Sequence, residues 1–557
     1  MRKIALFALV WLATFVAAPS RSTAAELKPV VVMTFSGYNE LRSDLDFIGQ
    51  LSDTPELGAS LDGLLAMLTK FQGLVGLDKT KPWGIAVSTD GMSLQNLAFI
   101  PVTDLKRLLG VLADLIGPPQ DMENAVVQIS VNGQPVYIKH ERGWAFLAMS
   151  PGELEDLPAD PQAIFGSLPK DYDVAVKANV QNVPQQYRDL AIGEMKRGMQ
   201  QGLQRRDDET DAQYNMRAKM MQEQLARLEQ AIKELNEITL GWSIDSKGRR
   251  ALLDLSITAV PGSQTAKQSA EAVAVPSKFN GFLSNDFLFN AHCATKESKI
   301  DVDNTAAMLD SLHSAISDAV DQSDDLKTQQ EKDAVKKLVT TLLDVVDATL
   351  KAGVVDGGMI VTPTAPFTIA AGLGVVGGDK LEGAFRQAVT LSKDKTDDLK
   401  VQLDADKHQG VTFHVIKGPW PANDDTDDDD KEMRDKTLGE SLVLTAAFGK
   451  DSAFLALGAD GVTAIKNVID ASAAGGKPAF PFQANLSMAR TMDFAAESEP
   501  DNPVLGICAD ALEKGKDKIH LTTSPITDGA RMRIEFEEGV VKVLGVLVRA
   551  LQPQPGR

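Results

Sequence analysis

A tetrapeptide that occurs twice constrains the fold of this chain more than any other feature. Ala-Phe-Leu-Ala stands at 145–148 and again at 453–456, each time where a predicted strand runs into a turn and an apolar helix start. The segments before and after the two tetrapeptides also match in the same order. We therefore expect an α+β fold with two tandem copies of a unit of roughly 250 residues, each an antiparallel sheet with helices.

The repeat sets the expected domain boundaries. The chain divides into a signal peptide at 1–25, a first α+β unit at 26–260, a linker at 261–279 and a second α+β unit at 280–557. The first unit contains a long helical stretch at 183–236, and the second contains an acidic loop insertion at 419–440. Insertions in a duplicated fold belong at the surface, because a shared core cannot absorb them.

Further matching residues give the expected register of the two copies. They are the helix starts Asp104 and Asp379, the Ile-Lys pairs at 138–139 and 416–417, Asn179 and Asn485, and Gly248 and Gly529. Asp104 is a good helix cap, with Thr103 as the alternative. Asn132-Gly133 predicts a tight hairpin between two strands of the first copy.

The first residues have the pattern of an export signal. Arg2 and Lys3 precede an apolar run at 4–18 and small residues at 22–25, which predicts a cleaved signal and a secreted or periplasmic protein. An uncleaved anchor is the alternative. No later apolar run is long enough to cross a membrane, so we expect no membrane span after cleavage. A net charge of −20 repels polyanions, so nucleic acid is not an expected partner.

Asp404, Asp406 and His408 alternate along a predicted strand, which would place all three on one face as candidate metal ligands, with His414 across the turn. Alternating polar residues near a hairpin tip usually form its solvent-exposed face, so a solvated strand face is expected and metal binding is the alternative. The aspartates at 424, 425 and 427–430 lack the glycine and the distal glutamate of a calcium loop, so a solvated acidic loop is expected. Cys293 and Cys508 both lie in the second unit, and the sequence leaves open whether they pair.

Gly372-Leu373-Gly374-Val375-Val376-Gly377 follows a predicted strand and precedes a helix, as a dinucleotide site does. The flanking segments predict antiparallel hairpins instead of a parallel βαβ unit, so we expect a glycine-rich strand end and no cofactor. No catalytic motif for a nucleophile or a metalloprotease is present, so catalytic residues are not assigned.

The helical stretch of the first copy has apolar residues at helical spacing, with several methionines before them. Such a stripe most often packs on its own domain. A docking surface for a protein partner at 184–236 is the alternative, because methionine-rich faces adapt to partner surfaces.

In its signal peptide, duplicated α+β body and acidic composition, the chain resembles exported bacterial proteins of unknown function. The resemblance covers the whole chain and implies no catalytic residues. We therefore expect an exported, non-catalytic binding or scaffold protein. An exported hydrolase whose site is assembled only in three dimensions is the alternative.

Overall fold

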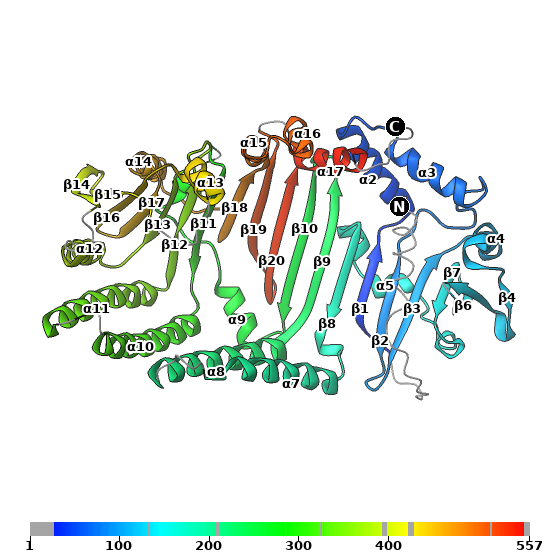
Figure 1. The fold of residues 1–557 in the computed structure, drawn as a ribbon. Helices are drawn as coiled ribbons and strands as arrows, with labels where there is room; N and C mark the ends of the chain where they lie inside the picture. Colours follow the sequence, from blue (N-terminus) through cyan, green and yellow to red (C-terminus); the bar gives the residue numbers. More distant parts are fainter. Residues whose placement is uncertain are drawn as a thin grey trace. The chain divides into compact units, whose positions relative to one another are not determined.

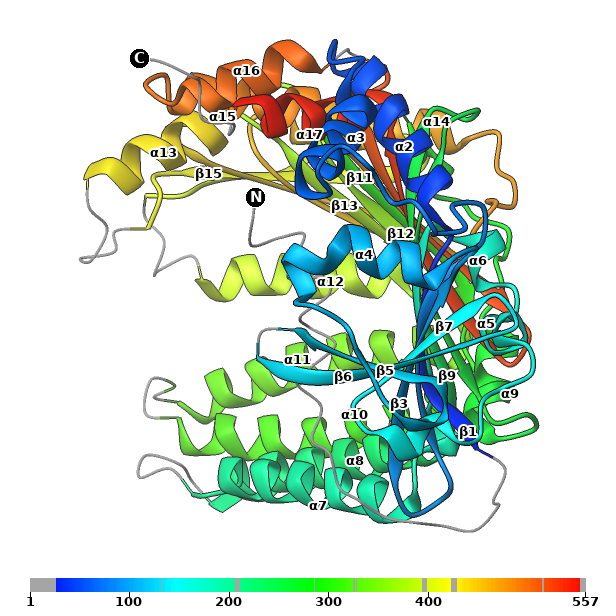
Figure 2. The same cartoon turned by 90° about the vertical axis from the view of Figure 1, so that its right-hand side faces the viewer.

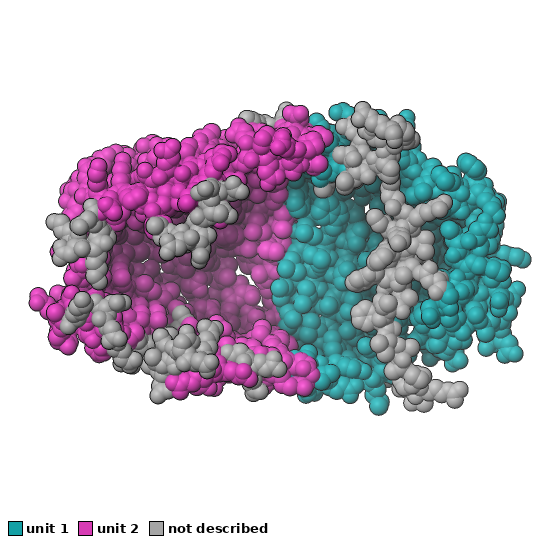
Figure 3. Space-filling model, in the orientation of Figure 1, with its two compact units in different colours: residues 1–193, 235–258, 535–557 teal, residues 194–234, 259–534 magenta. Residues whose placement is uncertain are grey.

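The computed structural model describes residues 27–550 apart from gaps at 132, 206–210, 285, 324–325, 327, 393–397, 422–427 and 513–514 (Figure 1). The expected signal peptide and Asp424, Asp425 and Asp427 lie outside the described residues. The chain forms two compact units (Figure 3). Unit 1 comprises 1–193, 235–258 and 535–557, and unit 2 comprises 194–234 and 259–534. Residues 194–234 therefore belong to unit 2 and residues 535–557 to unit 1, whereas the expected boundaries at 260 and 280 had placed each segment in the other unit.

The elements from the amino terminus to residue 259 are strands and helices of varied length. They are β1 (Lys28–Phe35), α2 (Tyr38–Leu51), α3 (Leu57–Leu68), β2 (Trp83–Thr89), β3 (Leu94–Pro101), α4 (Leu105–Ile116), β4 (Gln120–Asp121), β5 (Val126–Val131), β6 (Gln134–Glu141), β7 (Trp144–Ala148), α5 (Pro161–Phe165), α6 (Leu168–Asp171), β8 (Val174–Asn179), α7 (Gln185–Gly202), α8 (Asp211–Glu234), β9 (Leu235–Asp245) and β10 (Arg250–Ala259).

The remaining elements follow a similar order. They are α9 (Gln264–Glu271), η5 (Asn280–Leu283), β11 (Phe289–Lys296), α10 (Lys299–Gln322), α11 (Gln329–Lys351), β12 (Val354–Val361), β13 (Ile369–Gly374), α12 (Gly378–Ser392), β14 (Lys400–His408), β15 (Val411–Gly418), α13 (Asp428–Leu438), β16 (Leu442–Gly449), β17 (Ser452–Leu457), α14 (Gly461–Ser472), β18 (Phe482–Ser487), α15 (Met488–Ser498), α16 (Pro503–Ala511), β19 (Lys518–Ile526), β20 (Gly529–Glu537) and α17 (Glu538–Ala550). The expected linker therefore contains a helix, α9.

Local signals explain several of these elements. The Asp104 side chain accepts a hydrogen bond from the backbone N–H of Arg107 and caps α4, as predicted. β5 and β6 pair across the expected Asn-Gly turn, with Val131 opposite Gln134. Asp379 lies in the first turn of α12 instead of capping it. The predicted α+β class is confirmed: the pairings between described strands are antiparallel.

In unit 1 the sheet is built outward from β1. β1 pairs with β2 on one side and with β8 on the other. From β2 the order continues through β3, β7, β6, β5 and β4, and from β8 it continues to β9. The Ala-Phe-Leu-Ala strand β7 therefore lies between β3 and β6.

In unit 2 the sheet is built outward from β11 in the same way. β11 pairs with β12 and β18. From β12 the order continues through β13, β17, β16, β15 and β14, and from β18 it continues to β19. The second Ala-Phe-Leu-Ala strand, β17, lies between β13 and β16. The tandem duplication stays a prediction. The pairing order that the two units share favours it.

The pairings correct two of the expected matches. Ile138 lies on β6, directly beside the Ala-Phe-Leu-Ala strand, opposite Leu147. Ile416 lies on β15, one strand farther out, because β16 intervenes and places Ala446 opposite Leu455. The match of 138–139 with 416–417 was therefore wrong. The two Ile-Lys pairs lie on similar hairpin strands, but the sequence does not show which strand lies next to each of them.

The second correction concerns Asn179 and Asn485. Counted through the strand pairs from the two tetrapeptides, Asn179 corresponds to Ser487, two residues beyond Asn485. The same count keeps Gly248 matched with Gly529. The expected acidic loop lies between β15 and β16 and contains a helix, α13, whereas only two residues separate β5 from β6 in unit 1.

Each unit has its own aromatic core on one face of its strands. In unit 1, Phe99 packs edge-on against Phe146 and Phe165, with ring centroids 5.8 and 5.7 Å apart. In unit 2, Phe279 packs against Phe282 and Phe454 above the buried residues of α14. Burial of such rings is the main source of stability for each sheet.

The segments grouped differently from expectation make contacts within the units that hold them. Val541 of α17 packs with Phe47 and Leu51 of α2 in unit 1. In unit 2, α8 lies beside α10, and Glu234 at its end accepts hydrogen bonds from the N–H and hydroxyl of Thr265 in α9. Of the helices that the structure describes, none has the length and apolar character needed to cross a membrane.

Two adjacent residues of β17 test this assignment of the sheet faces. Phe454 is 6% exposed in the core, and its neighbour Leu455 is 53% exposed on the opposite face. Phe454→Ala should lower the free energy of unfolding by about 3–5 kcal/mol through lost burial and a cavity. Leu455→Ala should change it by no more than about 0.5 kcal/mol. Denaturant unfolding of both variants measures this, and equal losses would contradict the assignment.

Candidate functional site

One face of the unit 2 sheet carries an open apolar groove of about 580 Å³. Its floor consists of two rows of residues that follow the strand pairs across the sheet. The first row is Phe482, Cys293, Gly357, Leu373, Ala453 and Phe448, and the second is Ala291, Met359, Ala371, Leu455 and Ala446. Figure 3, in the orientation of Figure 1, shows a hollow in the surface of unit 2 over these strands.

Three apolar side chains on this floor are open to solvent. Met359, Leu373 and Leu455 are 36, 44 and 53% exposed, and they lie on the neighbouring strands β12, β13 and β17. The residues between them are alanine and glycine, whose small size gives the groove its depth. A contiguous exposed apolar surface of this kind marks a binding site more often than scattered exposed leucines do.

Aromatic side chains stand at the two ends of the first row. Phe482 on β18 lies at one end, opposite Cys293. Phe448 on β16 lies at the other end and packs against Phe385 of α12, with ring centroids 5.6 Å apart. The ring of His414 lies 5.3 Å from Phe385 and 5.9 Å from Phe448 and supports this wall.

Unit 1 has large side chains at the corresponding strand pair. Cys293 and Gly357 are paired across β11 and β12 in unit 2. In unit 1 the pair at this place across β1 and β2 is Phe35 and Trp83, whose rings stack with centroids 4.7 Å apart. The floor is therefore filled by two aromatic rings in unit 1 and left open by a thiol and a glycine in unit 2.

The glycines of β12 and β13 serve packing. A Cβ atom on Gly358 would lie 2.7 Å from the ring of Phe282, and one on Gly372 would lie 2.5 Å from the ring of Phe454. Gly377 has a φ of +97°, which favours glycine in the turn before α12. Because β13 lies antiparallel between β12 and β17, the run 372–377 has no parallel βαβ setting for a dinucleotide.

The groove lining offers few polar groups. Of the lining residues that the structure describes, none has an acidic, lysine or arginine side chain. Burial raises the pKa of the Cys293 thiol, and the carboxylates of Glu297 and Asp356 raise it further, so the thiol stays protonated near neutral pH. Cys293 and Cys508 are both free thiols.

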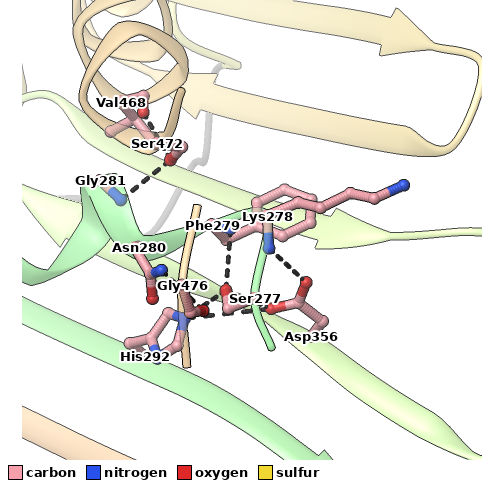
Figure 4. Close-up of polar contacts among 10 residues, drawn as sticks. All are labelled: Ser277, Lys278, Phe279, Asn280, Gly281, His292, Asp356, Val468, Ser472 and Gly476. Carbon is pink, nitrogen blue, oxygen red and sulfur yellow. Dashed lines mark hydrogen bonds and ion pairs between the residues drawn. The ribbon is translucent and has the colours of Figure 1, made fainter. Parts of the chain in front are cut away.

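Beneath the floor, on the core side, lies a cluster of Ser277, His292 and Asp356 (Figure 4). The Ser277 hydroxyl donates to Asp356 Oδ1 at 2.6 Å and lies 2.8 Å from His292 Nε2. It also accepts the backbone N–H of Phe279 at 2.8 Å, and Asp356 Oδ2 accepts the N–H of Lys278. Ser277 was assigned to the linker, so sequence reasoning had no reason to place it near a histidine.

These residue types are those of a serine hydrolase, but their arrangement is different. In a catalytic triad the histidine accepts the serine proton, and the aspartate holds the other ring nitrogen. Here Ser277 donates to Asp356, so His292 Nε2 donates to the serine oxygen, and the buried Nδ1 has no hydrogen-bond partner. Ser277 is 3% exposed. The cluster instead fixes the segment that leads from Ser277 into η5 under the sheet.

The structure does not bring the candidate metal ligands together. A register shift between Gln402 and Asp406 breaks the alternation on which the one-face prediction rested. Asp404 bonds Arg386 of α12, whereas Asp406 bonds Lys466 and His408 bonds Asp470, both of α14. The prediction that all three share a face was therefore wrong.

The two helices lie on opposite sides of the unit 2 strands (Figure 2). His414 faces α12 through Phe385, and the neighbouring Phe413 packs into the α14 core. Among the described residues there is no group of three or more side chains placed to hold a metal ion.

The helical stretch forms two helices, α7 and α8, joined by an ion pair of 2.7 Å between Lys196 and Glu229. Tyr187, Leu190 and Leu228 are 43, 57 and 44% exposed on it. A protein partner at 184–236 stays a prediction.

Sequence reasoning missed the groove residues. Their signal was present as the runs of small residues in Gly-Gly-Met-Ile-Val at 357–361 and Ala-Ala-Gly-Leu-Gly at 370–374. Which of these side chains share a face depends on the strand pairs, and these join segments more than 150 residues apart on β11 and β18. The sequence alone does not supply that pairing.

Comparison with family models, with curated proteins and with solved structures finds no match to this chain.

The buried cluster predicts a pH dependence of stability. Burial lowers the pKa of His292, and the nearby Asp356 opposes this shift only in part. The folded state then binds fewer protons than the unfolded state just below the ordinary histidine pKa of about 6.5. The free energy of unfolding should hold above that pH and fall as the pH drops through the lowered folded-state pKa.

His292→Gln should make this decrease shallower, since the variant lacks the titrating ring. Urea unfolding at a series of pH values measures the slope, with His140→Gln of β6 as a matched control in unit 1. An unchanged slope in His292→Gln would contradict a buried neutral histidine.

Proposed function

We propose that this chain is an exported, non-catalytic binding protein that holds a small apolar molecule in the unit 2 groove. The observation that carries the proposal is the exposure of Met359, Leu373 and Leu455 on three neighbouring strands, with alanine and glycine between them. A volume of about 580 Å³ falls in the range of small-molecule sites. Covering these side chains would remove apolar surface from water, which is the driving force for binding.

The chemistry of the lining supports binding over catalysis. A reaction requires groups that move protons or stabilise charge, and the described lining has a protonated thiol but no ionised side chain. The Ser277 cluster lies on the opposite, core face of the sheet. Its serine donates to the aspartate instead of to the histidine, as in a structural contact. The hydrolase alternative therefore gains no support from it.

Export is part of the same proposal. It rests on the basic, apolar and small-residue pattern of residues 1–25 and on the acidic composition of the chain. An apolar molecule needs a carrier wherever it must cross water, and a secreted or periplasmic protein with an open apolar groove suits that task.

A charged substitution on the floor tests the proposal. Leu455→Glu should weaken the binding of an environment-sensitive apolar dye at least tenfold, because ligand binding would then desolvate a carboxylate. Folding should be retained, since the side chain is 53% exposed. Fluorescence titration measures the affinity, and circular dichroism checks the fold.

Val504→Glu is the matched control. Val504 is 43% exposed at the start of α16 and is not part of the groove lining. Its dye affinity should equal that of the unmodified chain. Equal affinity in all three proteins, or no dye binding at all, would rule out the groove as the site.

A further inference from the structure

We infer that the molecule held in the groove is a single unbranched acyl chain that lies across the strands between Phe482 and Phe448. This inference rests on the proposed function and names its ligand class. Three features of the groove carry it: its length, its largely apolar lining, and the aromatic side chains at its two ends.

The length of the floor matches one acyl chain. Adjacent strands lie about 4.8 Å apart, so the four strands between those of Phe482 and Phe448, which are β11, β12, β13 and β17, span roughly 14 Å from first to last. The hydrocarbon core of a bilayer is about 30 Å thick, which gives each leaflet's acyl chains roughly 15 Å. The direction of the groove is set by the row of strand pairs from Cys293 to Ala453.

The lining selects against ligands with polar groups along their length. A polar group buried without a hydrogen bond costs free energy, and of the described lining side chains only Cys293 and His292 carry a hydrogen-bonding N–H or S–H group. His292 is already bonded to Ser277 on the core side. A bound peptide would bury backbone N–H and C=O groups over a floor whose strands already pair with each other. An acyl chain has no such groups, and its polar end can stay in solvent.

The aromatic ends limit the length of chain that fits. Phe448 and Phe385 line one end, and Phe482 lines the other. The affinity of the groove should therefore rise with chain length only until the floor is filled. This limit distinguishes a fitted acyl site from a surface that simply attracts apolar molecules.

The experiment measures the affinity of saturated fatty acids of increasing length, each below its micelle concentration, by displacement of the apolar dye. Each added methylene should increase the affinity about fourfold until the floor is filled, and longer chains should gain nothing more. Phe482→Ala should shift this plateau to longer chains. Ala371→Trp, at an exposed alanine in the centre of the floor, should weaken the binding of every long chain.

Other outcomes would overturn the inference in distinguishable ways. Dye binding without any dependence on chain length, or equally tight binding of a sterol, would keep the proposed function and reject the acyl chain. Loss of all dye and fatty-acid binding in the unmodified chain would reject both. Dimerisation in sedimentation experiments that Leu455→Glu abolishes would show that a second copy of the chain covers the floor, and would also reject the acyl chain.

Discussion

The alternation of side chains along the unit 2 strands is the constraint on which the account depends. Each strand presents one residue to the α14 core and the next to the groove. Phe454 fills the core, and the adjacent Leu455 stands exposed. The core rings require glycine at 358 and 372, where a Cβ atom would meet Phe282 or Phe454. On the other face the two rows of the floor have glycine or alanine at 291, 357, 371, 446 and 453, so one sheet has a packed side and an open side.

The two units show how the same pairing order leads to different surfaces. At equivalent strand pairs, unit 1 has the stacked rings of Phe35 and Trp83, and unit 2 has Cys293 and Gly357. A groove of this kind is produced by the absence of side-chain volume, without any special backbone conformation. Under the proposed duplication, one copy would have kept a filled face while the other became the binding unit.

Local patterns in the sequence were sufficient for the α+β class, the Asn-Gly hairpin and the Asp104 cap, because each depends on residues close together in the chain. They were insufficient where partners are distant. Ile138 and Ile416 lie on similar strands, and only the neighbour of each strand reveals that they are not equivalent. Asp404 does not share a face with Asp406 and His408, because a register shift between Gln402 and Asp406 changes which side chains point the same way. The groove depends both on local runs of small residues and on which distant strands pair, and in which register. No sequence motif marked it for that reason.

A molecule that lies on the groove floor would cover Cys293, so the thiol of this residue reports directly on the proposed binding place. In a Cys508→Ser variant, Cys293 is the only cysteine of the chain. Its alkylation rate should be measured with and without a saturating long-chain fatty acid. The account predicts that the bound chain covers the thiol and slows alkylation at least tenfold. An unchanged rate, under conditions where the fatty acid displaces the dye, would place the ligand elsewhere and contradict the account.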